Sequence, residues 1–186
     1  MDEACARAAR VLNDRATEGI GRVSHDDEAA VQSTAEAIAC SGIKYFDLNR
    51  DRLKDYVFSY EAMLGDTAVY LQYAHVRMSA MLRKSGKDMQ AVHLQTRIRL
   101  VDEAEIDLAV EVLSLTDALS AVCRDLQLLP LCKWLRDVCV QFSTFVNKCR
   151  VLGTAHEDSR LLLVHATAAA MRQAMALLGM HAVLKL

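Results

Sequence analysis

Histidine and cysteine are the residues here best suited to acid–base, metal or nucleophilic chemistry, and they are scattered along the sequence. The six histidines occur singly, with no HxGH-like spacing, at His25, His75, His93, His156, His165 and His181. The six cysteines form no CxxC pair and stand at Cys5, Cys40, Cys123, Cys132, Cys139 and Cys149. A zinc site needs ligands in close pairs. We therefore predict no metal site, and we interpret the cysteines as small buried thiols in a reducing cytosol.

Motifs for phosphate binding and nucleophilic catalysis are also missing. The sequence contains no P-loop, no GxGxxG and no nucleophile elbow. Local spacing suggests no Ser/His/Asp or Cys/His set either. Residue types alone therefore predict no catalytic residue.

Aromatic and basic side chains do combine in one stretch, YLQYAHVRMSAMLRK, which covers residues 70–84. It lacks Gly and Pro, and Asp66 and Thr67 precede it as candidate helix caps. Residues 75–99 carry six basic side chains and one acidic one, although the whole chain has a net charge of −2. That net charge argues against a nonspecific nucleic-acid binder, but the basic block allows a directed basic face.

The elements that position these residues are predicted to be helices. The hydrophobic fraction is 53%, with one Pro and seven Gly, which favours an all-α protein. We expect a bundle of five or six helices with a smaller N-terminal helical pair, and no apolar run reaches the ~18 residues of a membrane span. The expected helices cover residues 2–16, 28–40, 70–84, a long region containing 108–122, 131–149 and 159–178.

Several boundaries follow from local signals. Ser41-Gly42 is expected to break the second helix, and Gly179 to end the last one. The last helix is apolar nearly all round, so we expect its neighbours to enclose it. Residues 56–60 fit either a short extended segment or a helix start, and residues 87–93 fit either a loop or a short helix.

Four segments, in order, resemble the C-terminal part of the arginyl-tRNA synthetases, and one further helix fits a family pattern. The first segment, residues 12–40, falls where the family has helices that link the catalytic core to the bundle. Residues 42–48 and 55–58, GIKYFDL and DYVF, are similar to the family's "IKYADL…DYVF". Residues 67–77, TAVYLQYAHVR, are similar to "TAPYLQYAHAR". The passage LCKWLRDVCVQFSTFVNKCRVL fits "LxxYLxxLAxxFxxFYxxCxV", and the closing residues from Arg160 onward resemble the family's C-terminus. The resemblance covers residues 40–186 best.

This resemblance implies a division into residues 1–62, a helical connector like the end of the catalytic body, and 63–186, a DALR-type anticodon-binding bundle. It implies the C-terminal portion of a cytoplasmic arginine–tRNA ligase, which holds the anticodon arm of arginine tRNA during aminoacylation. ATP belongs to the whole family enzyme, and we expect no cofactor in this chain. The family's nucleotide-binding sheet, HIGH-type signature and KMSK-type loop are absent from these 186 residues.

Five positions correspond to tRNA contacts in the family. Tyr73 is the candidate for stacking on a base, Arg77 and Arg150 for contacts to phosphates or bases, and His75 and Leu186 are further candidates. Exposed aromatic rings stack on splayed loop bases, and basic side chains hold phosphates. Tyr73 could instead pack in the core beside Tyr70, and Arg77 could pair with a neighbouring carboxylate.

The sequence also departs from the family. Val146 stands where the family has Tyr, and Arg150 where eukaryotic members often have an aromatic residue. The closing "PVxRM" is replaced by Ala182-Val183-Leu184-Lys185-Leu186. Two other hypotheses therefore stay open: a free-standing DALR protein that presents tRNA to another enzyme, and a helical protein-interaction module without RNA binding.

Overall fold

The computed structural model describes residues 28–57 and 68–184, and all regular structure within these residues is helical. The helices are α2 (Glu28–Leu48), α4 (Ala68–Ser85), α5 (Met89–Gln95), α6 (Glu103–Leu113), α7 (Leu115–Asp125), α8 (Leu129–Lys148) and α9 (Glu157–Leu177). The prediction of an all-α bundle is confirmed. The helix expected over residues 2–16 lies outside the described residues.

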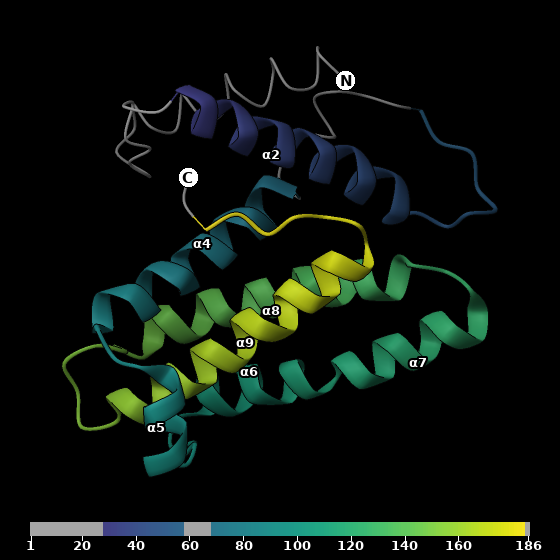
Figure 1. Ribbon diagram of the computed structural model, residues 1–186. Coiled ribbons are helices and arrows are strands. Elements are labelled where there is room, and N and C mark those ends of the chain that lie inside the picture. Colours follow the sequence, from purple (N-terminus) through teal and green to yellow (C-terminus); the bar gives the residue numbers. More distant parts are fainter. Residues whose placement is uncertain (1–27, 58–67, 185–186) are drawn as a thin grey trace.

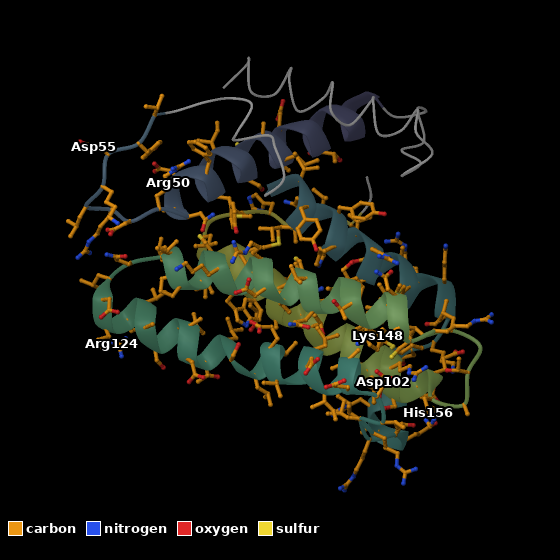
Figure 2. The ribbon with its side chains drawn as sticks, turned by 180° about the vertical axis from the view of Figure 1, so that it is seen from behind. Arg50, Asp55, Asp102, Arg124, Lys148 and His156 are labelled. Atoms are coloured by element: carbon orange, nitrogen blue, oxygen red, sulfur yellow. The ribbon has the colours of Figure 1, made fainter. Side chains whose placement is uncertain are left out.

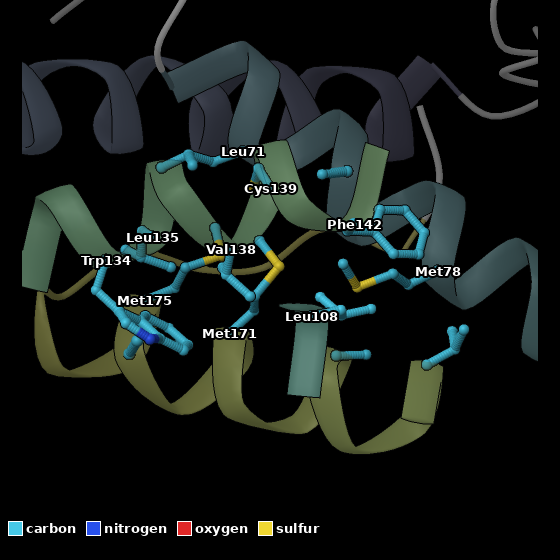
Figure 3. Close-up of a cluster of buried hydrophobic side chains, with 14 of the residues drawn as sticks. Leu71, Met78, Leu108, Trp134, Leu135, Val138, Cys139, Phe142, Met171 and Met175 are labelled. Carbon is cyan, nitrogen blue, oxygen red and sulfur yellow. The ribbon is translucent and has the colours of Figure 1, made fainter. Parts of the chain in front are cut away.

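The core forms around α8, which α4, α6, α7 and α9 contact (Figure 1). The apolar side of α8 predicted from the sequence is buried, with Leu135, Val138, Cys139 and Phe142 at most 2% exposed. These side chains meet Leu71 and Met78 of α4, Leu108 of α6, and Met171 and Met175 of α9 (Figure 3). Burial raises the pKa of the Cys132 thiol to about 12 and raises the pKa of Cys139 further, so both remain protonated core residues at neutral pH.

Helix α2 continues through Ser41-Gly42, so the predicted break there was wrong. The Ser41 hydroxyl donates to the Ala37 carbonyl at 2.6 Å and accepts from Gln72 Nε2 of α4 at 3.2 Å. Serine competes with helix mainly by bonding to nearby backbone. Here the hydroxyl bonds to the carbonyl four residues earlier, which is compatible with the helix. Burial against α4 then stabilises α2 as one unbroken helix.

The region around residues 103–125 is two helices that meet at Ser114. Ser114 Oγ donates to the Glu111 carbonyl at 2.8 Å, and α7 begins at the next residue. The predicted stripe is confirmed: Leu108 is buried, and Val112, Leu115, Leu119 and Val122 pack against the same core. Residues 89–95 form the short helix α5, which decides one of the alternatives left open by the sequence.

Helix α9 is not enclosed on all sides, and that prediction was wrong. Its buried side includes Leu161, Val164 and Met171, whereas Arg172 is exposed and Leu177 is 61% exposed. Gly179 follows the helix with φ of +66°, a left-handed conformation that favours glycine and marks the predicted helix end.

The segment after α2 has no regular structure at Tyr56 and Val57, and residues 58–60 lie outside the described part. The Tyr56 hydroxyl donates to Asp47, and the Arg50 guanidinium lies 4.2 Å from the ring centre of Phe46 and 4.6 Å from that of Tyr56. These contacts hold the segment against the end of α2, at the end of the molecule where Figure 2 labels Arg50 and Asp55.

Candidate nucleic-acid interface

The two tyrosines of α4 lie in different environments. Both are half-buried, but Tyr70 packs against the hydrophobic core, whereas Tyr73 is not part of the core cluster. Because a helix turns by about 100° per residue, Tyr73, Arg77 and Lys84 share one side of α4, away from Leu71 and Met78. The structure therefore places Tyr73 beside Arg77 on the outer side of the helix.

Arg77 is half-buried and pairs with no carboxylate among the described residues. Its charge is thus not neutralised within this part of the chain. A ring and a guanidinium one helical turn apart provide a stacking face and a phosphate donor on the same surface. A single-stranded RNA loop can bind through such a pair, because a base stacks on the ring while a phosphate accepts from the guanidinium.

His75, by contrast, points into the molecule and is fully buried. Its Nδ1 lies 2.9 Å from the Val183 carbonyl oxygen, which can only accept, so Nδ1 carries the proton. Nε2 has no hydrogen-bond partner among the described residues. Burial lowers the pKa of His75 more than the bond to Val183 raises it, and the charge of Arg172 lowers it further. The imidazole is neutral at pH 7 and contacts the C-terminal segment.

Residues 178–184, the C-terminal segment, run past α4 and α2 after the end of α9 (Figure 1). Gln72 binds the segment at two points: Nε2 donates to the His181 carbonyl at 2.7 Å, and Oε1 accepts from Val183 N–H at 3.0 Å. Arg83 donates to the Leu184 carbonyl at 2.9 Å, and Lys44 of α2 donates to the Gly179 carbonyl. The predicted contact Leu186 lies outside the described residues.

Arg150 is exposed just after α8, at the end of the bundle where α9 begins. Arg160 donates to its carbonyl at 2.7 Å, and a Cβ placed on Gly153 would lie 3.7 Å from its Nη2. The nearby Lys148 is also exposed, and Figure 2 shows it at the same end as Asp102 and His156. Neither Arg150 nor Lys148 pairs with a carboxylate in the described part of the chain.

The structure does not bring Tyr73 and Arg150 together in one pocket. Tyr73 lies in the first half of α4, and the helix continues for about 18 Å beyond it at 1.5 Å per residue. Just past its end, Lys87 Nζ lies 2.8 Å from Glu157 and 2.5 Å from Asp158, which ties α4 to the start of α9, beyond Arg150 in the chain. A ligand that touched both positions would have to extend along this length of α4.

A groove of about 1080 Å³ opens between α9 and the segment formed by α5 and the residues after it. Its lining combines basic or imidazole side chains, His93, Arg97 and His165, with the apolar Leu94 and Ile98. Arg97 belongs to the basic block at residues 75–99. The groove therefore receives one positive charge of this block, that of Arg97.

The sequence did not identify Gln72 and Arg83 as residues that bind the C-terminal segment. Gln72 is fully buried in α4, whose buried side is apolar apart from Gln72 and His75. Buried amides need partners, so an amide in the middle of YLQYA was the available signal. The partners themselves lie 109 and 111 residues away and could not be read from local spacing.

Other site classes find no support within the described residues. No group of three or more His, Cys, Asp or Glu side chains there could hold a metal ion. No helix in residues 28–57 or 68–184 is long and apolar enough to cross a membrane.

Two family profiles match the chain. One is described as the DALR anticodon binding domain and matches residues 71–186. The other is described as tRNA synthetases class I (R), catalytic domain, and matches residues 1–60.

Individual relatives agree with these profiles. The cytoplasmic arginine–tRNA ligase of Arabidopsis thaliana is 38% identical over 189 residues, covering 100% of this chain and 31% of that protein. The arginine–tRNA ligase of Sodalis glossinidius is 35% identical, with 98% of this chain and 31% of that protein covered. The crystal structure of arginyl-tRNA synthetase from Plasmodium falciparum superimposes with a TM-score of 0.88 at 30% identity, over 100% of this chain and 32% of that one.

The chain thus spans just under a third of the length of these relatives. The profile match to residues 71–186 covers more than half of the chain. The resemblance drawn from the sequence is confirmed. The chain belongs to the arginyl-tRNA synthetase family and carries its C-terminal region with the DALR anticodon binding domain.

Proposed function

We propose that this chain binds the anticodon arm of arginine tRNA and serves an arginine–tRNA ligase in aminoacylation. The observation that carries the proposal is the outer side of α4 within the matched DALR region, where Tyr73 lies beside Arg77, whose charge is paired with no carboxylate among residues 28–57 and 68–184. In this proposal residues 63–186 are the anticodon-binding bundle and residues 1–62 lead from the catalytic body. The partners are arginine tRNA and a catalytic synthetase portion, in the cytoplasm.

The proposed contacts follow from the chemistry of each side chain. The ring of Tyr73 stacks on an unpaired base, and Arg77 donates to a phosphate or to a base edge. Arg150 contacts the RNA at the far end of the bundle, with Lys148 beside it. Leu186 is a further proposed contact, and the buried His75 acts indirectly, by binding the C-terminal segment.

The charge distribution supports one direction of approach. Residues 100–130, which contain α6 and α7, carry one basic and seven acidic side chains, whereas residues 75–99 carry six basic and one acidic. RNA phosphates are repelled by the first region and attracted by the second. The tRNA therefore approaches the side of the bundle that carries α4 and α5.

A binding titration with arginine tRNA at several salt concentrations tests the proposal. We expect affinity to fall as salt rises, with a log–log slope of about −0.7 to −0.9 for each phosphate contact, because bound cations displace counterions. Few contacts are expected, so the total slope should be small. A non-cognate tRNA of equal length controls for nonspecific binding.

Arg77→Met provides the matched variant in the same titration. It should weaken binding and reduce the slope by about one contact. Arg124→Met removes an arginine at the other end of the molecule, where the guanidinium pairs with Asp125 at 3.0 Å (Figure 2). It should leave both affinity and slope unchanged. If the chain binds no tRNA at any salt concentration, the interaction-module hypothesis replaces this one.

A further inference from the structure

The outer side of α6 carries a line of exposed apolar side chains, which we call the α6 stripe. Ile106, Val110 and Leu113 follow one another at spacings of four and three residues, and they are 44%, 61% and 74% exposed. At about 100° per residue they lie within about 60° of one another, on the far side of the helix from the buried Leu108. The stripe therefore faces away from the core.

The stripe is confined to α6. No large apolar side chain between Leu115 and Asp125 is exposed, although α7 continues along the same side of the bundle (Figure 1). Single apolar residues on a surface are ordinary. Three of them in line at spacings of four and three residues form the kind of seam along which one helix packs on another.

A line of carboxylates runs beside the stripe. Glu103 and Asp107 are exposed and Glu111 is half-buried, and they follow one another at intervals of four residues. None of the three forms an ion pair within the described part of the chain. These charges repel RNA phosphates and anionic lipid headgroups, and they attract a basic partner.

The α6 stripe lies apart from the surfaces already assigned. Helix α2, which falls in the region matched by the catalytic-domain profile, packs on α4 and α8 and lies on the opposite side of the bundle from α6 and α7 (Figure 1). The tRNA is proposed to approach the side that carries α4 and α5. A protein bound on α6 therefore leaves both of those sides open.

We propose that the α6 stripe is a docking surface for a basic amphipathic helix of another protein. The apolar line of that helix packs against Ile106, Val110 and Leu113, while its Lys or Arg side chains pair with Glu103 and Asp107. A second copy of this chain fits less well, because residues 100–130 carry one basic and seven acidic side chains and two such faces repel each other. The stripe is short, so the contact is small and reversible.

The probe is a fluorescently labelled helical peptide of about 18 residues, long enough to cover α6, with leucines at the spacing of the stripe and lysines beside them. A second peptide carries glutamate in place of every lysine, and a third has the residues of the first in scrambled order. Fluorescence anisotropy follows the binding of each peptide to the full chain.

Three variants of the chain are compared. Val110→Ser interrupts the apolar line, and Val140→Ser makes the same change at a valine of α8 that is 47% exposed. Asp107→Lys reverses one charge beside the stripe. All three side chains are exposed, so the melting temperatures should stay within a few degrees of that of the unmodified chain.

We expect the unmodified chain to bind the lysine peptide more tightly than the other two peptides. Val110→Ser should weaken this binding about 3- to 10-fold, because it removes an apolar contact, and Val140→Ser should not change it. Asp107→Lys should weaken it about 2- to 10-fold, and less at high salt. The same variant should bind the glutamate peptide more tightly than the unmodified chain does.

Equal binding of the lysine and scrambled peptides, or equal losses for Val110→Ser and Val140→Ser, would overturn the proposal. Sedimentation tests the second copy: if the unmodified chain dimerises and Val110→Ser abolishes the dimer, the stripe is instead an interface between copies. If Val110→Ser weakens binding of arginine tRNA or of a separately supplied catalytic portion, the stripe belongs to the contacts of the synthetase itself, and the proposal fails. A chain that binds no tRNA would refute the proposed function but leave the docking surface intact.

Discussion

Tyr70 and Tyr73 are one turn apart on α4, and their different contacts with the core cluster give opposite expectations. Tyr73→Ala should weaken tRNA binding by about 1–3 kcal/mol, the usual contribution of a stacked base. It should leave the melting temperature within a few degrees, since Tyr73 lies outside the core cluster. Tyr70→Ala is the matched control, and it should lower the free energy of unfolding because Tyr70 packs against that cluster.

Binding titrations and melting curves of the two alanine variants distinguish these roles. A loss of about 3–5 kcal/mol in stability for Tyr73→Ala, the range for a truncated buried aromatic, would mean that Tyr73 is a core residue. The sequence left that alternative open.

His75 gives a pH dependence whose sign is fixed by its environment. Burial lowers the pKa of His75 in the folded state, so the unfolded chain binds the proton more readily. As pH falls below the unfolded value of about 6.5, protonation favours unfolding, and stability is lost until pH reaches the folded pKa. The free energy of unfolding, measured by urea titration between pH 7.5 and 5, should therefore fall with pH.

The same urea titrations on His75→Asn isolate this contribution, because asparagine does not titrate. The difference in stability between the two proteins should change across this pH window. His93→Asn serves as the control at an exposed histidine. Parallel pH curves for His75→Asn and the unmodified chain would contradict the assignment.

Predictions of which residues are buried succeeded where the spacing within one helix was sufficient to make them. The spacing of residues 70–84 predicted one face made of Tyr70, Tyr73, Ala74, Met78 and Met81. Ala74 and Met78 are buried and Tyr70 and Met81 pack against the core, but Tyr73 does not belong to the cluster. The environment of His75 depends on Val183, which is 108 residues away, and the environment of Gln72 depends on His181. No local pattern encodes such a contact, because the order in which helices pack decides it.

At the level of elements, one buried ion pair connects the starts of α6 and α9. Glu105, 1% exposed, accepts from Arg160 Nε at 2.6 Å and from the N–H groups of Val101 at 2.6 Å and Asp102 at 3.0 Å. Together with Asp102, it forms the capping box of α6. Burial alone would raise the pKa of Glu105, but these donors outweigh it and lower the pKa.

Arg160→Met should therefore lower the free energy of unfolding by about 3–5 kcal/mol, since it leaves a buried carboxylate without its cation. Arg136→Met removes one partner of an exposed pair on α8, 3.2 Å from Asp137, and should change stability by about 0–1 kcal/mol. Urea unfolding at pH 7 measures both. Equal effects of the two substitutions would show that burial of the Glu105 pair does not matter.

Element boundaries were harder to predict than the elements themselves. Helix α8 was predicted because its apolar residues recur at helical spacing, and Pro130 lies in its first turn, where a missing N–H costs no helical bond. Ser41-Gly42 misled the prediction because its stabilising contact, the Gln72 amide, comes from another helix. The division at Ser114 had no Gly or Pro to signal it.

For the whole molecule, we expect no aminoacylation by this chain alone. Charging a tRNA requires ATP and the amino acid to be held together while charge on the phosphates is stabilised. The 186 residues contain no glycine-rich phosphate loop and no HxGH-like histidine pair for this purpose. Incubation with ATP, arginine and its tRNA should yield no arginyl-tRNA and no arginine-dependent pyrophosphate exchange.

A separately supplied catalytic portion is the informative addition to that assay. It should restore charging if the two parts bind each other, and gel filtration of the mixture would report the complex directly. Arginyl-tRNA formed by the chain on its own would require an active site of a kind that its residues do not suggest.

Helix α2 lies in the part of the chain that matches the catalytic-domain profile, residues 1–60, yet it contributes to the core of the bundle. Tyr45 of α2 is 1% exposed, belongs to the central cluster, and donates through its hydroxyl to the Cys132 carbonyl of α8 at 2.9 Å. The border between the two matched profiles therefore does not coincide with the border of the hydrophobic core, because α2, a helix about 31 Å long, packs into that core through Tyr45.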